Sequence, residues 1–274
     1  MIIKTLVENT CHFPDLTPEH GLSLYVETLQ KKLLFDVGSG DQFQKNAKIM
    51  GVDLQEVDFV VISHGHYDHG GGLRTFLNHN THANIYIRQC AFGNYYTNDS
   101  NGDERYIGLD KTLMESPQMV MTPRRLEIEP GFELFSGVRG SDYNPSANRQ
   151  LLMDSEGALT PDAFEHEQNL IVAEGEKTFL FAGCAHRGIA NIMEQFYRLK
   201  KHYPTHVIGG FHLYSQSKSK DEDPKKVAEL GKYLKEKPTQ YYTCHCTGIA
   251  PYQQLKEQLG DQIDYLPTGS HITL

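Results

Sequence analysis

The chain has 274 residues, of which 39% are hydrophobic and 22% are charged, the composition of a globular protein with a buried core. Its formal net charge of −9 argues against binding to the nucleic-acid backbone, because such proteins present a basic surface. No segment approaches the roughly 18 consecutive apolar residues that a membrane span needs.

The first third of the chain predicts alternating strands and helices. Period-2 or β-branched patterns predict strands at Ile2–Glu8 and Leu22–Glu27, and the apolar segment Lys32–Asp36 predicts a third. The amphipathic segment Gln42–Met50 predicts a helix that the following glycine ends. Asp58–Ser63 is a short apolar run, which is typical of a strand buried on both faces.

The middle of the chain has a weaker pattern. We expect a strand at Asn84–Arg88, a long polar loop over Cys90–Asp110, and further strands within Met119–Gly131 and Phe132–Gly137. We interpret the region of about 90–150 as an elaboration over a functional site, so that residues 1–274 form one domain.

The second half becomes regular again. Strands are predicted at Leu170–Ala173, Phe179–Ala182, His206–Ile208 and Tyr241–Thr243, and helices at Ile189–Lys201, Pro224–Lys235 and Pro251–Leu259. All of these strands but the first end in clusters of Gly, Cys or His. In layered α/β folds, functional residues collect where strands end.

Cysteine and histidine content narrows the class of protein. The five cysteines are scattered, as expected for thiols in a reducing cytoplasm, and the N-terminus becomes polar too early for a signal peptide. We therefore expect a cytoplasmic protein. The 14 histidines, several of them in short Gly-rich runs, suggest metal binding. A bound metal would be the largest local charge, so a small anionic substrate is compatible with the negative chain.

The motif SHGHYDHGG follows the predicted buried strand directly. It places three imidazoles and a carboxylate on one tight turn, at His64, His66, Asp68 and His69. Alternate residues of an extended segment point the same way, so His64 and His66 can bind one ion together, while Asp68 and His69 reach a second. Imidazole and carboxylate ligands suit zinc, and also iron or manganese. The motif therefore predicts a pair of divalent metal ions.

HGHYDH resembles the HxHxDH signature of the metallo-β-lactamase superfamily. The resemblance extends to Asp36 in LLFDVGSG, which corresponds to a buried aspartate that orients the metal-binding loop in that family. Such a carboxylate fixes the tautomer of a histidine by accepting its free N–H.

The segment HEQNLIVAEGEKTFLFAGC resembles the stretch of class B β-lactamases that contains a histidine, two strands and Gly-Gly-Cys. This resemblance makes His166 the third ligand of the first metal. It places Cys184 where the superfamily has a bridging aspartate or a zinc-binding cysteine, and a thiolate favours zinc. In the subfamily closest to this chain GCAHRG is a hallmark, which makes His186 the competing ligand. We rank His186 ahead and keep His166 as a ligand or substrate contact.

Two later strand ends contain further histidines. CHCTG at 244–248 resembles the place of the last metal histidine of the superfamily, so His245 is expected to bind the second metal. His212, in VIGGFHL, could be that last ligand by order alone. RNase Z-like relatives have a polar residue at the earlier strand end and keep the ligand at the later one. We therefore assign His212 to substrate binding or proton transfer.

Motifs along nearly the whole chain resemble a prokaryotic subfamily labelled 7,8-dihydropterin-6-methyl-4-(β-D-ribofuranosyl)-aminobenzene-5′-phosphate synthase-like. They are VENT, EHGLSLYVET, LLFDVGSG, KNAKIMGVDL, SHGHYDHGGGL, GCAHRGIANI, GGFHL and CHCTG. The resemblance implies an α/β fold, the four-layered αβ/βα metallo-β-lactamase sandwich, with an inserted middle region. It does not fix the substrate, because a fold-level label is weak evidence for one.

These residues favour a metal-dependent hydrolase or phosphoryl-transfer enzyme. Two zinc ions would lower the pKa of a bridging water toward about 7, and Asp68 could hold the hydroxide or accept a proton. Arg88 and Arg187 can bind phosphate oxygens, and Tyr106 can stack on a flat ring such as a pterin or base. We expect a small, anionic, phosphorylated substrate. Composition and motifs leave the oligomeric state open.

Two other classes of function remain possible on these residues. One is a di-metal oxidoreductase, although such members of the superfamily usually carry a flavodoxin-like domain and this chain has no Gly-rich flavin motif. The other is a sensor or binding protein that keeps the fold and the metal without turnover, against which the complete first motif argues.

Overall fold

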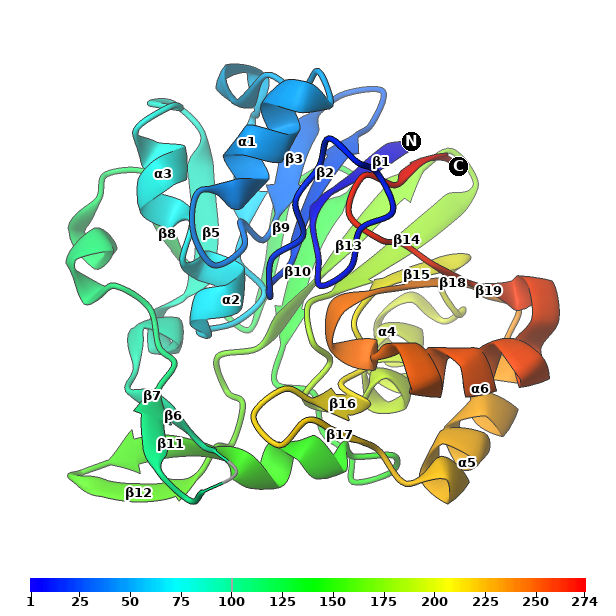
Figure 1. Cartoon of the computed structure of the whole chain (residues 1–274). Coiled ribbons are helices and arrows are strands. Elements are labelled where there is room, and N and C mark those ends of the chain that lie inside the picture. The colour runs from blue at the N-terminus through cyan, green and yellow to red at the C-terminus, as the bar shows by residue number, and fades with distance from the viewer. Residues whose placement is uncertain (100) are drawn as a thin grey trace.

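Two seven-stranded sheets packed face to face form the centre of the protein, a computed structural model that describes residues 1–99 and 101–274 (Figure 1). In spatial order the first sheet contains β20 (His271–Thr273), β1 (Ile2–Val7), β2 (Ser23–Glu27), β3 (Lys32–Phe35), β4 (Phe59–Val61), β5 (Asn84–Arg88) and β8 (Met119–Thr122). Strands β3, β4, β5 and β8 are parallel to one another, so their carboxyl ends meet at one edge of the sheet.

The second sheet has the same division into a parallel and an antiparallel part. Its spatial order is β19 (Ile263–Tyr265), β18 (Gln240–Thr243), β15 (His206–Gly209), β14 (Lys177–Ala182), β13 (Gln168–Glu174), β10 (Phe132–Ser136) and β9 (Arg125–Glu129). The first four of these strands are parallel, and β13, β10 and β9 continue the sheet antiparallel. Because β14, β15 and β18 are parallel, their carboxyl ends also share an edge.

Three apolar clusters separate four layers. One cluster joins the outer face of the first sheet to α1 (Gln42–Ile49) and α3 (Leu73–Leu77), and a second joins the outer face of the other sheet to α4 (Ile189–Lys200), α5 (Pro224–Lys235) and α6 (Ile249–Leu259). The third lies between the sheets. The four-layered αβ/βα sandwich expected from the sequence is therefore confirmed.

Aromatic side chains fill the layer between the sheets. The ring of Phe35 on β3 lies 5.7 Å from that of Phe181 on β14, and Phe59 on β4 packs edge-on against Phe132 on β10 at 5.4 Å. Buried aromatic pairs of this kind add stabilisation beyond the area that they remove from water. This packing holds the two sheet edges that carry the strand ends in a fixed relation.

Most predicted elements are confirmed within two residues at their ends, including all four second-half strands and α1, α4, α5 and α6. The expected long loop over Cys90–Asp110 is wrong in part. It contains β6 (Tyr95–Asn98) and β7 (Glu104–Tyr106), which form a four-stranded sheet with β11 (Leu151–Ser155) and β12 (Ala158–Pro161). β6 pairs with β11, more than fifty residues later, and such long-range pairing leaves no local pattern in a polar segment. Residue 100 of that expected loop lies outside the described residues.

The described helices are all too short or too polar to cross a membrane. This agrees with the hydropathy of the sequence.

The layer between the sheets generates a stability prediction. Phe181→Ala should lower the free energy of unfolding by about 3–5 kcal/mol, because it removes a fully buried ring and leaves a cavity. Urea denaturation followed by circular dichroism measures the change. Leu29→Ala is the matched control, since this side chain is 91% exposed, and should change stability by less than about 0.5 kcal/mol. Equal stability of the two variants would contradict the assigned packing.

Candidate metal centre

The carboxyl ends of five parallel strands from the two sheets meet at one place. Each is followed within a few residues by a side chain able to bind a metal or to orient a metal ligand: Asp36 after β3, His64 after β4, Cys184 after β14, His212 after β15 and His245 after β18. All five side chains are buried. Two adjacent groups of possible metal-binding side chains result.

The first group contains His64, His66 and His186, whose potential ligand atoms all lie within 4.8 Å of one another. The Nε2 atoms of His64 and His186 are 3.2 Å apart. Donor atoms around a tetrahedral zinc ion, with metal–nitrogen bonds of about 2.0 Å, lie about 3.3 Å apart. The spacing of these imidazoles therefore matches that of ligands sharing one ion.

The second group surrounds the carboxylate of Asp68 on α2 (Tyr67–Gly70). Its Oδ2 lies 3.6 Å from Nε2 of His69 and 3.3 Å from Nε2 of His245, and these two nitrogens are 3.2 Å apart. Burial would raise the pKa of Asp68, but His69, His245 and His20 hold it well below its usual range. The carboxylate is thus ionised and available as a ligand.

Hydrogen bonds fix the tautomers of four of these histidines. The Nδ1 atoms of His69, His245 and His186 lie 2.6–3.1 Å from the oxygens of Asp36, Asn9 and Asn148, which accept their protons. His64 Nδ1 donates to Ser63 Oγ at 2.8 Å, because that hydroxyl gives its own proton to Asp36. The Nδ1 atom of each of these four histidines therefore carries hydrogen, and in the neutral form of each ring Nε2 presents a lone pair to the cluster.

Facing lone pairs require a positive charge between them. Burial lowers the pKa of both His64 and His186 well below the usual range, so no proton occupies the space between their Nε2 atoms at neutral pH. For His69 burial acts in the same direction, but Asp36 and Asp68 raise the pKa to about 9, so a proton or a metal can occupy the second group. These donor sets fit divalent metal ions in both positions.

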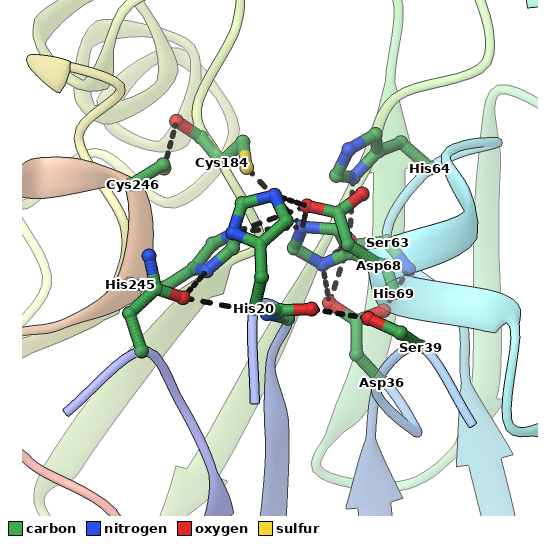
Figure 2. Close-up of polar contacts among 12 residues, drawn as sticks. His20, Asp36, Ser39, Ser63, His64, Asp68, His69, Cys184, His245 and Cys246 are labelled. Atoms are coloured by element: carbon green, nitrogen blue, oxygen red, sulfur yellow. Dashed lines mark hydrogen bonds and ion pairs between the residues drawn. The ribbon is translucent and has the colours of Figure 1, made fainter. Parts of the chain in front are cut away.

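Asp36 ties the two groups together (Figure 2). Its carboxylate accepts hydrogen bonds from Ser63 N, Ser63 Oγ and His69 Nδ1 at 2.6–2.7 Å. The residue itself has φ 62°, in the left-handed region, which turns the chain sharply at the end of β3. Its placement is that of the loop-orienting carboxylate expected from the sequence.

Cys184 lies between the two groups (Figure 2). Its Sγ is 3.2 Å from His69 Nε2, and it also shares a possible site with His186 and His212. A second thiol that the sequence did not single out, Cys246, lies within 4.8 Å of it. Burial raises the pKa of the Cys184 thiol well above its usual range in the absence of a cation.

His166 is placed beside the metal-binding turn, with both ring nitrogens engaged by protein groups. Its Nδ1 accepts a hydrogen bond from Gly65 N at 3.0 Å, and its Nε2 donates to Asp162 at 2.9 Å. His212 is different: both ring nitrogens are buried without a partner among the described residues, and its ring lies 4.2 Å from that of His186. Its backbone φ of 51° lies in the left-handed region, which is uncommon for a residue other than glycine.

Two cavities adjoin the groups. A small one of about 70 Å³ is lined by Asp68, His212, His245 and Arg105 among others, and a larger one of about 710 Å³ reaches His186. Arg187, predicted to bind substrate, lines the larger cavity. Its guanidinium donates to the carbonyls of Val138 and Ala163.

Arg88 and Tyr106, also predicted to bind substrate, line neither of these two cavities. Arg88 donates to the carbonyls of Thr122 and Glu165, and the Tyr106 hydroxyl donates to Leu109 O while 43% of the residue stays exposed. The structure therefore brings Arg187, but not these two residues, to the larger cavity.

Sequence reasoning missed His20, Asn9 and Asn148. Asn9 follows β1 in the motif VENT, so its position at a strand end was the available signal. Asn148 lies in a polar segment without a pattern. His20 Nε2 lies 3.4 Å from Asp68 Oδ2, and burial lowers the pKa of this imidazole to about 4. A lone histidine in the loop before β2 gave no indication of this placement.

Comparisons with known proteins identify a related family and a similar fold. Residues 16–91, which include Asp36 and the motif from His64 to His69, match the metallo-beta-lactamase superfamily. The crystal structure of Tm1679, a metal-dependent hydrolase of the beta-lactamase superfamily, superposes on 100% of this chain and 99% of its own length with a TM-score of 0.83 and 29% identity.

Two proteins of Methanocaldococcus jannaschii are similar to this metallo-β-lactamase-fold chain in sequence. An uncharacterized protein is 28% identical over 263 residues, which cover 93% of this chain and 94% of the relative. The 7,8-dihydropterin-6-methyl-4-(beta-D-ribofuranosyl)-aminobenzene-5′-phosphate synthase is 24% identical over 274 residues, covering 93% of this chain and 90% of the relative.

The buried carboxylate of this metallo-β-lactamase fold generates a prediction. Asp36→Asn keeps the side-chain shape but gives His69 and Ser63 a mixed amide in place of two acceptor oxygens. We expect the affinity for a divalent metal ion to fall by about 10–100-fold, the usual effect of losing a group that orients a ligand. Competition with a chromogenic chelator measures the affinity. Asp41→Asn, at an exposed carboxylate immediately before α1, is the control and should bind metal as the unmodified chain does.

Proposed function

We propose that this protein is a metal-dependent hydrolase with a dinuclear zinc centre that acts on a small phosphorylated substrate. The observation that carries the proposal is the 3.2 Å separation of the His64 and His186 Nε2 atoms, with each Nδ1 proton donated elsewhere. Two neutral imidazoles held in this way repel unless a cation lies between them. A structural histidine cluster would instead alternate donors and acceptors.

We assign the first ion to His64, His66 and His186. His166 is not included, because its two ring nitrogens are already engaged by Gly65 and Asp162. It is better suited to orienting the turn that contains the first ligands. Three histidines leave one position of a tetrahedral ion free, as in catalytic zinc sites.

We assign the second ion to Asp68, His69 and His245, with Cys184 between the two positions. Imidazole, carboxylate and thiolate together favour zinc over iron or manganese, because thiolate is a soft ligand. Bound zinc would supply a Lewis acid and lower the pKa of a coordinated water toward about 7.

Two side chains of the protein would then orient the attacking water and transfer a proton. The ionised Asp68 faces the small cavity, where it can accept a hydrogen bond from an attacking water and fix its orientation. His212 lines the same cavity, and neither of its ring nitrogens has a hydrogen-bond partner among the described residues, so it can transfer a proton to a leaving group. Burial of both residues keeps competing solvent away from the reacting atoms.

Cationic side chains support an anionic substrate. Arg149, Arg187 and Lys226 line the larger cavity, which reaches His186 of the first group. Guanidinium groups match pairs of phosphate oxygens. The similar synthase from Methanocaldococcus jannaschii has a pterin and a phosphate ester in its name, which is consistent with a phosphorylated substrate that carries a flat ring.

Metal content separates the two candidate third ligands. His186→Ala should lose about one equivalent of zinc and at least a hundredfold of activity on a chromogenic phosphodiester, because a ligand to the first ion is removed. His166→Gln should retain both zinc ions. Mass spectrometry of metals after purification without chelator gives the count. Iron with a charge-transfer band in the purified protein would favour an oxidoreductase instead, and full activity of His186→Ala would contradict the assignment.

The larger cavity gives a second prediction. Arg149→Ala should raise KM for a phosphorylated substrate about tenfold with little change in kcat, because an exposed cation at the cavity binds substrate and transition state alike. Steady-state kinetics at two salt concentrations measures both constants. Arg198→Ala, on the exposed side of α4, is the matched control. An unchanged KM for Arg149→Ala would remove this cavity from substrate binding.

A further inference from the structure

The loop between β1 and β2 is packed tightly on the metal-binding turn. Leu22 N donates to the carbonyl of Asp68 at 3.0 Å, and a Cβ at Gly21 would overlap the same oxygen. Asn9, at the start of the loop, accepts from both Gly21 N and His245 Nδ1. The backbone of His20 is therefore fixed relative to both Asp68 and His245.

The His20 side chain points into the second group (Figure 2). Its Nε2 lies 3.4 Å from Asp68 Oδ2, and its ring centroid lies 5.2 Å from that of His245. His20, Asp68 and His245 form a set whose potential ligand atoms all lie within 4.8 Å. On the far side of the ring, Nδ1 is buried without a partner among the described residues.

We infer that His20 is a further protein ligand of the second metal ion, beside Asp68, His69 and His245. The inference rests on the proposed metal pair. The 3.4 Å between His20 Nε2 and Asp68 Oδ2 is long for a charge-assisted hydrogen bond, which measures about 2.7–2.9 Å. It matches the roughly 3.3 Å between two donors on one tetrahedral zinc ion, as do the other spacings around Asp68.

A purely structural histidine at this position would be held from both sides. His166 shows that arrangement, with one nitrogen accepting and the other donating to protein groups. Among the described residues the His20 ring has one polar contact, to Asp68, and a shared ion would account for its orientation.

A fourth protein ligand at the second ion would give the two ions different roles. Apart from Cys184, which lies between the two positions, the second ion would then have four protein donors of its own, the number that fills a tetrahedral shell in structural zinc sites. The first ion, with three histidines, keeps the open position that catalysis needs. Substrate or water is therefore expected to bind mainly at the first ion, next to the larger cavity that reaches His186.

Zinc titration against a competing chelator tests the assignment in the full chain. His20→Ala should weaken one of the two zinc equivalents by more than tenfold and leave the other unchanged. His12→Ala removes an exposed histidine of the same loop and should bind both ions as the unmodified chain does. Unchanged affinities in His20→Ala would overturn the inference. Failure of the unmodified chain to bind metal would overturn the proposed function as well.

A spectroscopic measurement separates a ligand from a positioning residue. In the cobalt-loaded protein each coordinated imidazole gives a paramagnetically shifted, exchangeable N–H proton signal. The unmodified chain should show one such signal more than His20→Ala. An equal number of signals in the two proteins, even with weakened zinc binding, would mean that His20 only orients Asp68 and would overturn the ligand assignment.

Discussion

One buried carboxylate, Asp36, accepts three hydrogen bonds, and these bonds determine how the histidines of the site are oriented and protonated. Asp36 has no exposure to solvent, and an ionised group in that position must be fully satisfied by protein donors. Its donors are the backbone and hydroxyl of Ser63 and the ring of His69. Because the Ser63 hydroxyl donates its proton to Asp36, its oxygen must accept the hydrogen bond from His64 Nδ1. One carboxylate thus sets the tautomers of two histidines in different metal positions.

Close contact between the two sheets brings the remaining ligands to this network. Gly183, at the end of β14, packs against Ser63 so tightly that a Cβ would overlap the hydroxyl. The absence of a side chain at Gly183 lets Cys184 and His186 of the second sheet approach His64 and His69 of the first. The aromatic layer between the sheets fixes that approach. The geometry of the metal centre therefore depends on the packing that stabilises the core.

Local patterns predicted what depends on local structure. The buried strand β4 and the motif after it could be recognised from sequence, since hydrophobic runs and ligand spacing lie within a few residues. The choice between His166 and His186 could not, because it depends on whether Gly65 and Asp162 occupy the ring nitrogens. The place of His20 in the site could not be predicted for a similar reason. Its loop is polar, and the packing of Gly21 on Asp68 brings the side chain to the site. The middle sheet was missed because β6 and β11 pair across a long separation.

The two metal positions differ in what surrounds them, and this difference bears on the direction of the reaction. The second group is enclosed by loops from both ends of the chain, with Asn9 joining the His20 loop to His245. The first group borders the larger cavity through His186, whose backbone N–H is held by the buried Glu167. Both cavities have basic and acidic lining: Arg149, Arg187 and Lys226 stand beside four carboxylates in the larger one, and Arg105 stands beside Asp68 in the smaller. On the proposed function, Arg149 and Arg187 would bind the charge of an anionic substrate near the first group. Its reacting bond would then lie between the two groups, where the Asp68 carboxylate and the His212 imidazole can exchange a proton with it.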